Sequence, residues 1–513
     1  PAKLPETYVP LSKGKKHAFK EVLEINSRKE LYKELEALKK KFLPFMENKA
    51  PEIKNTRDRV YLTQFQWRQE TSGDRENFIS TLRGEGDWKN VQVPHFDAPY
   101  GRATTYYYKK INVSREMLQD RALFVHFKAV DYKAHVFLNG AYIGSHEGFF
   151  APFEFNISKY AKEGENELLV QVENDYTTTG FVAAGKERFF GDKIYGVTGL
   201  GYDNFYDGGH QGAAGMGIYQ DCYLESRDPI HINDIYVRPL YDEGMAEIRI
   251  EVNNYNEDRR PISFDLSIFG QNFESIVLKD SLIIPSALHV PGVGDLQKPT
   301  DWQHSRTSLG YGPNYFTYYV KIPEFRSWSN DAPWLYQAQI KVLNENNTIV
   351  DAKKQTFGMR SFTMDTISIP KGRMYFNNQK IRLRGANTMG FLQQDVYKKD
   401  WNQLIDDILL AKLTNMNFLR MTQRPVQPEI YEYADMLGLM LQTDFPTFGG
   451  IRYNQWEECV KQVSEMERLI RNHPSNILVT YINERFPNGE GHPHRNMATP
   501  DQYFSLFRAM DEA

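Results

Sequence analysis

The chain has 513 residues, of which 41% are hydrophobic and 25% are charged, and its formal net charge is -4 at pH 7. This length exceeds what one hydrophobic core usually serves and predicts about three domains. The balanced charge excludes the basic surface expected of a nucleic-acid-binding protein, and no apolar run reaches the roughly 18–20 residues of a membrane span.

The two cysteines, Cys222 and Cys459, lie far apart in the sequence and lack the spacing of a metal site. We expect both to be buried structural residues outside any disulfide framework. The chain begins at Pro1, without an initiator methionine or an apolar signal segment. We therefore expect a processed N-terminus and a periplasmic or secreted protein, and a cytoplasmic location stays open.

Residues 1–60 are polar and contain one predicted helix. Ser27 and Glu30 have the spacing of a capping box, which marks the start of the helix, and Pro44 ends it. The apolar side chains between them fall on one helical stripe: Leu31, Leu35, Leu38 and Phe42. We expect this N-terminal helical extension to pack on the surface of the domain that follows it.

Residues 61–225 contain many short runs of β-branched and aromatic residues with a period of two. Asn139-Gly140 separates two such runs and is a strong hairpin signal. The pattern predicts a jelly-roll β-sandwich. A Gly-, Tyr- and Asp-rich insertion at 180–217 contains Asp203, Asn204 and Asp207, which could bind a cation or sugar hydroxyls. The alternative is a solvated loop, since the spacing does not match a calcium loop.

Residues 226–357 form a second β-rich block. Residues 246–252 and 337–342 alternate between apolar and polar side chains, as strands with one buried face do. The size and pattern predict an immunoglobulin-like sandwich. We see no chemistry in this block and expect it to support its neighbours.

From residue 358 onward, predicted strands alternate with helices. The strands are at 380–385, 417–421, 439–443 and 477–482, and the helices are at 401–414, 429–437 and 455–471. This alternation with short connections implies a parallel sheet wrapped by helices. A closed (β/α)8 TIM barrel needs about 250 residues, so we expect residues 358–513 to hold only its first half.

The last predicted strand ends at Asn483-Glu484. A carboxylate at the C-terminal end of a parallel strand is where barrel enzymes place their chemistry. The alternative is that Glu484 is merely the first solvated residue of the next loop.

Short motifs occur in a specific order from about residue 61 to the end. Those of the first β-block are at 137–140, 143–144, 148–153, 164–170 and 217–224, and those of the second are at 333–336 and 357–360. Further motifs at 376–381, 384–387 and 471–475 precede Asn483-Glu484. Together they resemble the jelly roll, immunoglobulin-like domain and barrel of glycoside hydrolase family 2, which includes β-galactosidases, β-glucuronidases and β-mannosidases.

The resemblance implies an exo-acting, retaining β-glycoside hydrolase. Glu484 would be the general acid/base, and Asn483 would hydrogen-bond the sugar 2-hydroxyl. Arg420 would orient and support the nucleophile, with a structural ion pair under the barrel rim as the alternative. Asp444 would line the sugar subsite, with a helix cap or rim carboxylate as the alternative. Asn387, at the entry into the barrel, would also bind substrate.

Three departures from the family pattern leave the accepted sugar open. Arg420 is followed by Met-Thr-Gln-Arg-Pro at 421–425, where many β-galactosidases and β-glucuronidases carry His-Tyr-Pro. The run Gln-Thr-Asp-Phe-Pro at 442–446 is nearer to the β-mannosidases. Residues 480–482 lack the usual tryptophan. We expect a β-galactosidase-like enzyme. The alternatives are a β-mannosidase, a β-glucuronidase, or a non-catalytic carbohydrate-binding scaffold with a degenerate barrel.

The two-carboxylate mechanism needs a second glutamate, which in the family ends the seventh barrel strand. We expect that nucleophile to lie outside these 513 residues, in a longer enzyme, and the 513-residue chain alone to be inactive. Glu490, in the loop after Glu484, is expected to be solvated.

No cofactor or metal is expected. Some family members bind Mg²⁺ or Na⁺ near the acid/base, and His492 and His494 could ligate a cation, but no carboxylate has matching spacing. The expected partner is the carbohydrate substrate. Nucleic acid and membrane are not expected, and a homo-oligomer stays open.

Overall fold

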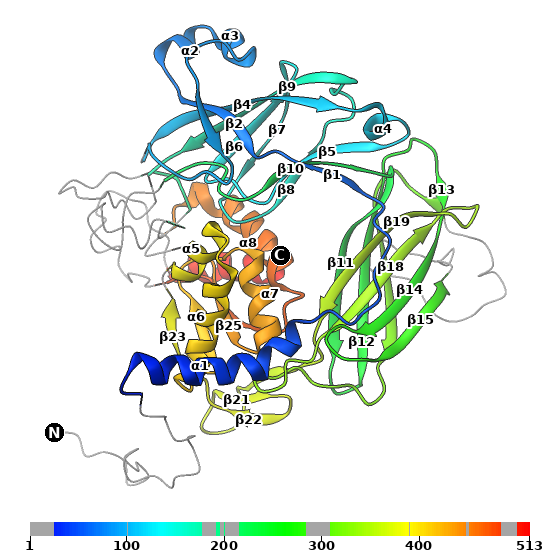
Figure 1. Ribbon diagram of the computed structural model, residues 1–513, viewed down its shortest axis with the longest axis vertical. Coiled ribbons are helices and arrows are strands. Elements are labelled where there is room, and N and C mark those ends of the chain that lie inside the picture. The colour runs from blue at the N-terminus through cyan, green and yellow to red at the C-terminus, as the bar shows by residue number, and fades with distance from the viewer. Residues whose placement is uncertain are drawn as a thin grey trace.

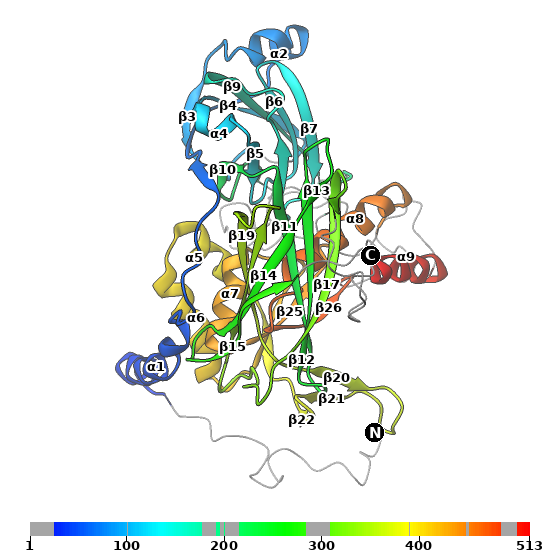
Figure 2. The same ribbon diagram turned by 90° about the vertical axis from the view of Figure 1, so that its right-hand side faces the viewer.

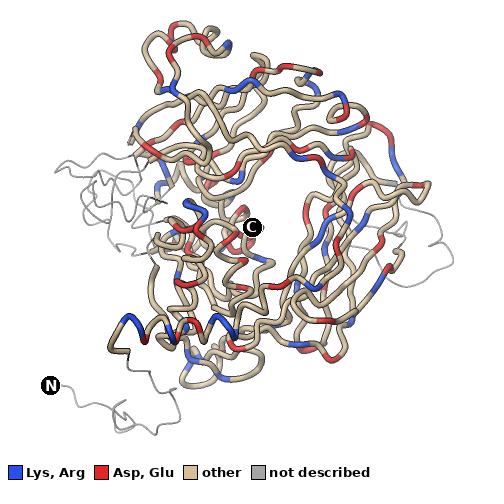
Figure 3. Tube along the Cα trace, viewed as in Figure 1, with Lys and Arg blue, Asp and Glu red and all other residues tan. Residues whose placement is uncertain are grey.

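Three sheet systems follow one another along the chain (Figure 1). The computed structural model describes residues 25–99, 101–176, 191–194, 200, 215–283, 308–388, 390–447, 451–483 and 500–513. The first β-sandwich stands at one end of the molecule, and a small antiparallel sheet stands at the other (Figure 2). Lys and Arg residues are interspersed with Asp and Glu residues along all three parts (Figure 3).

The first part is the predicted jelly-roll sandwich. One sheet has the order β1-β10-β5-β8 and the other β3-β2-β4-β9-β6-β7. The strands of the first sheet are β1 (Asp58–Tyr61), β10 (Cys222–Arg227), β5 (Ala122–Phe127) and β8 (Phe153–Asn156). Those of the second are β3 (Lys89–Gln92), β2 (Gln64–Gln69), β4 (Ala103–Val113), β9 (Gly164–Asn174), β6 (Lys133–Leu138) and β7 (Ala141–Glu147). Three short helices join them: α2 (Ser72–Glu76), α3 (Phe78–Leu82) and α4 (Arg115–Leu118).

The hairpin predicted at Asn139-Gly140 is confirmed. It joins β6 to β7, and both turn residues have positive φ, 51° at Asn139 and 81° at Gly140. A two-residue turn of this kind needs left-handed backbone at both positions, which asparagine and glycine adopt most easily. The Asn139 side-chain amide also donates to the carbonyl of Tyr160 at 2.9 Å, which ties the turn to a neighbouring loop.

The second part is the predicted immunoglobulin-like sandwich. A three-stranded sheet is formed by β11 (Ile230–Leu240), β12 (Met245–Asn254) and β17 (Gly312–Lys321). A four-stranded sheet is formed by β15 (Ile276–Ile283), β14 (Ser263–Gly270), β18 (Tyr336–Leu343) and β19 (Ile349–Phe357). A short pair, β13 (Arg260–Pro261) and β16 (Ser308–Leu309), lies at one end. The apolar positions of both sheets meet in one core, as the alternating pattern predicted.

The third part is a parallel sheet with the order β23-β24-β25-β26. Its strands are β23 (Gly385–Thr388), β24 (Phe418–Met421), β25 (Met440–Asp444) and β26 (Asn476–Thr480). The helices are α5 (Phe391–Lys398), α6 (Trp401–Leu413), α7 (Pro428–Leu437), α8 (Trp456–Ile470) and α9 (Pro500–Glu512). Gly438 takes the left-handed conformation at the C-cap of α7, with φ 70°. The described residues thus contain four parallel strands with helices between them, as predicted.

The single strand predicted at 380–385 is wrong. A small antiparallel sheet, β20 (Phe362–Asp365), β21 (Arg373–Phe376) and β22 (Gln379–Ile381), ends at Ile381, and the parallel sheet begins only at Gly385. The reason is a tight turn at Asn377 and Asn378, which both have positive φ and fold 379–381 back onto β21.

The N-terminal helix is present, but its predicted packing partner is wrong. Helix α1 (Arg28–Phe42) begins at Ser27, whose hydroxyl accepts from the Glu30 backbone N–H at 3.2 Å. Its buried residues, Leu35 and Phe42, join the core of the barrel helices instead of the jelly roll. Lys39 of α1 also pairs with Asp406 of α6 at 2.7 Å. A short stripe of leucine and phenylalanine fits any apolar surface, so the sequence could not choose between them.

Residues 43–57 then run along the immunoglobulin-like sandwich to the jelly roll, and we call them the connecting segment (Figure 1). The Asn272 amide donates to the carbonyl of Phe45 at 3.0 Å, and the Gln339 amide donates to that of Pro51 at 2.6 Å. The backbone N–H of Lys49 donates to a carbonyl of the same sandwich at 2.6 Å. One stretch of chain therefore touches all three parts.

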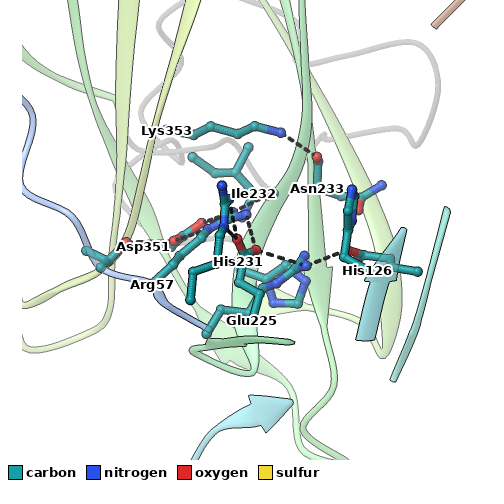
Figure 4. Close-up of polar contacts among 12 residues, drawn as sticks. Arg57, His126, Glu225, His231, Ile232, Asn233, Asp351 and Lys353 are labelled. Carbon is teal, nitrogen blue, oxygen red and sulfur yellow. Dashed lines mark hydrogen bonds and ion pairs between the residues drawn. The ribbon is translucent and has the colours of Figure 1, made fainter. Parts of the chain in front are cut away.

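Arg57, at the end of the connecting segment, joins the two sandwiches (Figure 4). Its guanidinium donates to both carboxylate oxygens of Asp351 on β19, at 3.1 and 2.7 Å, and to the carbonyl of Ile232 on β11 at 2.6 Å. It also pairs with Glu225 on β10 at 3.3 Å. Burial opposes ionisation of Asp351, but hydrogen bonds and the charge of Arg57 hold the pKa of that carboxyl below its usual value.

Both cysteines are buried and unpaired, as predicted. Burial raises the pKa of each thiol, so both are protonated and unreactive at neutral pH. Among the helices of the described ranges, none is long and apolar enough to cross a membrane.

Candidate active site

The carboxyl ends of β24, β25 and β26 bring together most of the described candidate residues. Leu419 and Leu441 point toward the helices, where they join the barrel core. Because side chains alternate along a strand, Arg420 and Gln442 point to the opposite face of the sheet. These two residues are also partners across the β24–β25 ladder. Their shared face is the inner face of the parallel sheet.

Arg420 and Asp444 form a two-point ion pair on this face. Nε of Arg420 donates to Oδ1 of Asp444 at 3.1 Å, and Nη2 donates to Oδ2 at 2.5 Å. Oδ2 also accepts from the backbone N–H of Gln423 at 2.9 Å, and Oδ1 accepts from the Gln442 amide at 3.0 Å. The Asp444 side chain is 0% exposed, whereas Arg420 keeps 22% of its side chain exposed. Asp444 therefore fixes the position of the guanidinium from its buried side.

Asn483 is attached to the same guanidinium. Nη2 of Arg420 donates to Oδ1 of Asn483 at 2.6 Å. The backbone N–H of Asn483 donates to the carbonyl of Thr447 at 3.0 Å, and the Thr447 hydroxyl donates in turn to the carbonyl of Tyr481. Asn483 is only 6% exposed. Since its oxygen is occupied by Arg420, its amide Nδ2 is the group left to donate elsewhere.

Asn387 lies beside this cluster. It is exposed on β23 and is the ladder partner of Arg420. Glu484, the next residue after Asn483, lies outside the described residues, and so do Glu490, His492 and His494. Asp203, Asn204 and Asp207 of the 180–217 insertion are outside them too. Where the chain is described, no group of three or more His, Cys, Asp or Glu side chains could hold a metal ion.

Three family models match the chain over most of its length. Residues 86–195 match the sugar binding domain of glycosyl hydrolases family 2, and residues 230–360 match the model named for that family itself. Residues 367–511 match the family's TIM barrel domain. The chain belongs to glycoside hydrolase family 2.

Individual glycoside hydrolase family 2 relatives are distant. The chain is 23% identical over 429 residues to a putative β-glucuronidase of Formosa agariphila, covering 80% of this chain and 44% of that protein. It is 24% identical over 482 residues to a β-galactosidase of Priestia megaterium, covering 84% of this chain and 41% of that protein. The crystal structure of a Bacteroides uniformis β-glucuronidase superposes with a TM-score of 0.67 at 18% identity. That superposition covers 89% of this chain and 51% of the other, so the chain spans about half the length of its relatives or less.

Three residues of this candidate site were missed by sequence reasoning: Gln423, Gln442 and Thr480. The Gln442 amide donates to the Thr480 hydroxyl at 2.6 Å as well as to Asp444, so it fixes the carboxylate from the side. The sequence could have indicated Gln442, because it lies two residues before Asp444 on the same strand and such residues point to the same face of the sheet. Gln423 has φ 63°, and its left-handed backbone was not foreseeable from sequence.

The turn before β26 is held by a buried ion pair. His473 Nδ1 lies 2.6 Å from Asp435 Oδ2, and Asp435 Oδ1 accepts from the backbone N–H of Ser475 at 2.9 Å. Burial works to lower the pKa of His473, but the charge and hydrogen bond of Asp435 prevail and raise it above its usual value. Since β26 leads to Asn483, this pair supports the strand that positions one residue of the candidate site.

Proposed function

We propose that this protein is a retaining, exo-acting β-glycoside hydrolase in which Glu484 is the general acid/base. The cluster of Arg420, Asp444 and Asn483 at the carboxyl ends of parallel strands is the observation that supports it most. Barrel enzymes carry out their chemistry at this edge. Glu484 follows Asn483 directly in the sequence.

Asn483 would donate Nδ2–H to the 2-hydroxyl of the sugar. Arg420 occupies the amide oxygen, so it also fixes which end of the amide faces the substrate. A hydrogen bond to this hydroxyl strengthens as the transition state gains oxocarbenium character, so it lowers the barrier instead of only tightening binding. Glu484 would protonate the leaving glycosidic oxygen and then take a proton from the attacking water.

Arg420 would hold the second carboxylate of the double displacement. Its Nη1 has no hydrogen-bond partner in the described part of the chain, and the side chain is partly exposed. An unused donor next to the buried Asp444 pair suits an ionised carboxylate that attacks the anomeric carbon. In this proposal the attacking carboxylate comes from residues other than the described ones, about 5–5.5 Å from the acid/base as retention requires.

We propose a β-galactoside as the substrate, with β-glucuronide and β-mannoside as the alternatives. Curated relatives named β-galactosidase support the first and a relative named putative β-glucuronidase supports the second. The sequence run 442–446 supports the third. Hydrolysis of 4-nitrophenyl β-glycosides by the natural gene product would rank the three.

The acid/base assignment is tested with Glu484→Gln, and Glu490→Gln in the same loop is the matched control. Glu484→Gln should abolish hydrolysis of alkyl glycosides, which have poor leaving groups, and spare much of the first step on dinitrophenyl glycosides, whose leaving group needs no proton. Glu490→Gln should change neither. Full activity of Glu484→Gln on alkyl glycosides would overturn the assignment.

Stereochemistry tests the double displacement separately. Proton NMR during hydrolysis should show the β-anomer of the released sugar first. Early appearance of the α-anomer would contradict the retaining mechanism. Sugar binding with no turnover by the natural gene product would instead favour the non-catalytic carbohydrate-binding scaffold.

A further inference from the structure

A concavity of about 550 Å³ lies on the outer face of the jelly roll, over β3, β2 and β4. Its volume is within the roughly 300–1,000 Å³ of ligand sites in proteins. These strands stand at the end of the molecule opposite to the small sheet β20–β22, and away from the barrel strands (Figure 2). We call this concavity the amide cleft, because its lining includes the four amide residues Gln64, Gln66, Asn90 and Gln92, next to Tyr108 and two lysines.

Strand pairing arranges four primary amides in this cleft. Phe65 is 2% exposed and points into the sandwich core, so Gln64 and Gln66 on either side of it point outward. Gln64 is the ladder partner of Gln92, and Gln66 is the partner of Asn90. Facing side chains in a ladder have Cβ atoms about 4.5–5.5 Å apart, so the amides form two neighbouring pairs.

These amides are not used by the fold. All four residues are exposed. Within the described ranges, the side chains of Gln64, Gln66 and Asn90 make no hydrogen bond, and Gln92 makes one long contact of 3.3 Å to the carbonyl of Val93. A primary amide carries two donors and an acceptor, so the cleft presents a dense set of unused groups of both kinds.

The cleft also carries little free charge. Lys110 pairs with Glu165 at 2.8 Å, and no carboxylate lines the concavity. Lys109 donates to the Gln64 carbonyl at 2.7 Å, and burial lowers the pKa of its amine. The Tyr108 hydroxyl donates to Glu167 at 3.1 Å, and its ring forms part of the floor. An acidic ligand would find one cation without a carboxylate partner in the described ranges, the Lys109 amine, and that amine is already bonded to the Gln64 carbonyl.

Residues 72–88, which include α2 and α3, cover the part of this outer face around Tyr106 and Tyr108. Phe78 packs on Phe137 with ring centroids 5.3 Å apart, and Trp88 packs on Tyr108 at 5.7 Å. Arg68, between the Trp88 and Tyr106 rings, pairs with the buried Asp74 of α2. The rings around Tyr108 are therefore covered, and the amides of β2 and β3 beside them stay exposed.

We propose that the amide cleft binds a neutral polysaccharide chain, at a site separate from the barrel. Sugar hydroxyls donate and accept at once, as primary amides do, and adjacent hydroxyls match the two ends of one amide. Each such hydrogen bond contributes little in water, so affinity should be modest and come from several amides together. The cleft would hold a polymer near the enzyme and would not take part in bond cleavage.

Affinity electrophoresis of the 513-residue chain tests the proposal, because it measures binding without turnover. Native gels would contain soluble galactan, galactomannan, xyloglucan or hydroxyethylcellulose, and polygalacturonate would serve as an acidic polymer. We expect retardation by at least one neutral polymer. The triple variant Gln64→Ala/Gln66→Ala/Asn90→Ala should weaken that binding on the order of tenfold or more, at about 1.4 kcal/mol per tenfold.

Gln119→Ala removes an exposed amide of the same domain outside the cleft and should leave retardation unchanged. The single variants Gln66→Glu and Asn90→Asp keep side-chain size and add a charge, so they repeat the test should the triple variant fold poorly. Retardation by no neutral polymer, by polygalacturonate alone, or equally for wild type and all cleft variants would overturn the proposal. In the natural gene product, activity on small aryl glycosides should be the same for every cleft variant, which separates this site from the proposed catalytic one.

Discussion

Arg420 holds Asn483 with the same nitrogen that holds Asp444: Nη2 lies 2.6 Å from Asn483 Oδ1 and 2.5 Å from Asp444 Oδ2. A buried carboxylate therefore sets the position of the guanidinium, and the guanidinium sets the orientation of the asparagine amide. A substitution at Asp444 should therefore also change the orientation of the Asn483 amide, because Arg420 contacts both side chains.

Asp444→Asn tests whether Asp444 positions Asn483 through Arg420. The exchange keeps the shape of the side chain but removes the charge that Arg420 faces, and breaking a buried pair costs about 3–5 kcal/mol. We expect a lower melting temperature of the barrel and a fall of kcat on aryl glycosides of about 10²-fold, because a misplaced group costs that much. Calorimetry measures the melting temperature, and initial rates of the natural gene product measure kcat. A lower melting temperature with unchanged kcat would show that Arg420 and Asp444 are only a structural ion pair.

The Arg57 junction predicts how the two sandwiches depend on each other. Arg57→Ala leaves Asp351, which is 0% exposed, without its bidentate partner, and should destabilise the junction by about 3–5 kcal/mol. In differential scanning calorimetry the sandwiches should then unfold in separate steps.

Arg59→Ala is the matched control for that junction. Arg59 pairs with the same Glu225 but is 42% exposed, and Glu225 keeps Arg57 and Arg227 as partners. An exposed pair contributes about 0–1 kcal/mol, so this variant should unfold nearly as the wild type does. Equal effects of the two substitutions would contradict a junction role for Arg57.

His473 predicts that the stability of the barrel domain depends on pH. Its pKa is raised in the folded state, so the pair with Asp435 stabilises fully below the unfolded pKa of about 6.5. That stabilisation is lost as pH rises through the higher folded pKa. His473→Gln should remove this slope from melting temperatures measured between pH 5.5 and 9, and an unchanged slope would refute the assignment.

Asp395 predicts a second change of stability with pH, which is independent of His473. Burial, and then the neighbouring Asp407, raise the pKa of Asp395 to about 7. The folded state therefore holds a proton that the unfolded carboxyl releases near pH 4, and stability falls as pH rises from about 4 to 7. Asp395→Asn should raise the melting temperature at pH 8 but not at pH 4. Asp87→Asn, at an exposed carboxylate, should show no such difference.

Local features of the fold were predictable because neighbouring residues decide them. Asn139-Gly140 specifies its own turn, and Ser27 with Glu30 specifies the start of α1. The partner of α1 was not predictable, because its apolar stripe suits any apolar surface. The break between β22 and β23 was missed because residues 380–385 read as one strand, whereas the Asn377-Asn378 turn before them pairs only residues 379–381 with β21.

The site was predictable in its members and not in its contacts. Strand ends identify Arg420, Asp444 and Asn483, but their hydrogen bonds join residues 24 and 63 positions apart. Only the three-dimensional structure shows that Asp444 binds the Arg420 guanidinium and that the Gln442 amide donates to the Asp444 carboxylate. The bonds of Arg57 to Asp351 span 294 positions, and no local pattern marks them.

The path of the first helix and the connecting segment has a consequence for protein synthesis. Helix α1 leaves the ribosome long before α6, its packing partner, which is completed some 370 residues later. At about 5–20 residues per second, the apolar side of α1 waits roughly 20–70 seconds for its cover. During that interval the apolar side chains of Leu35 and Phe42 are open to chaperones.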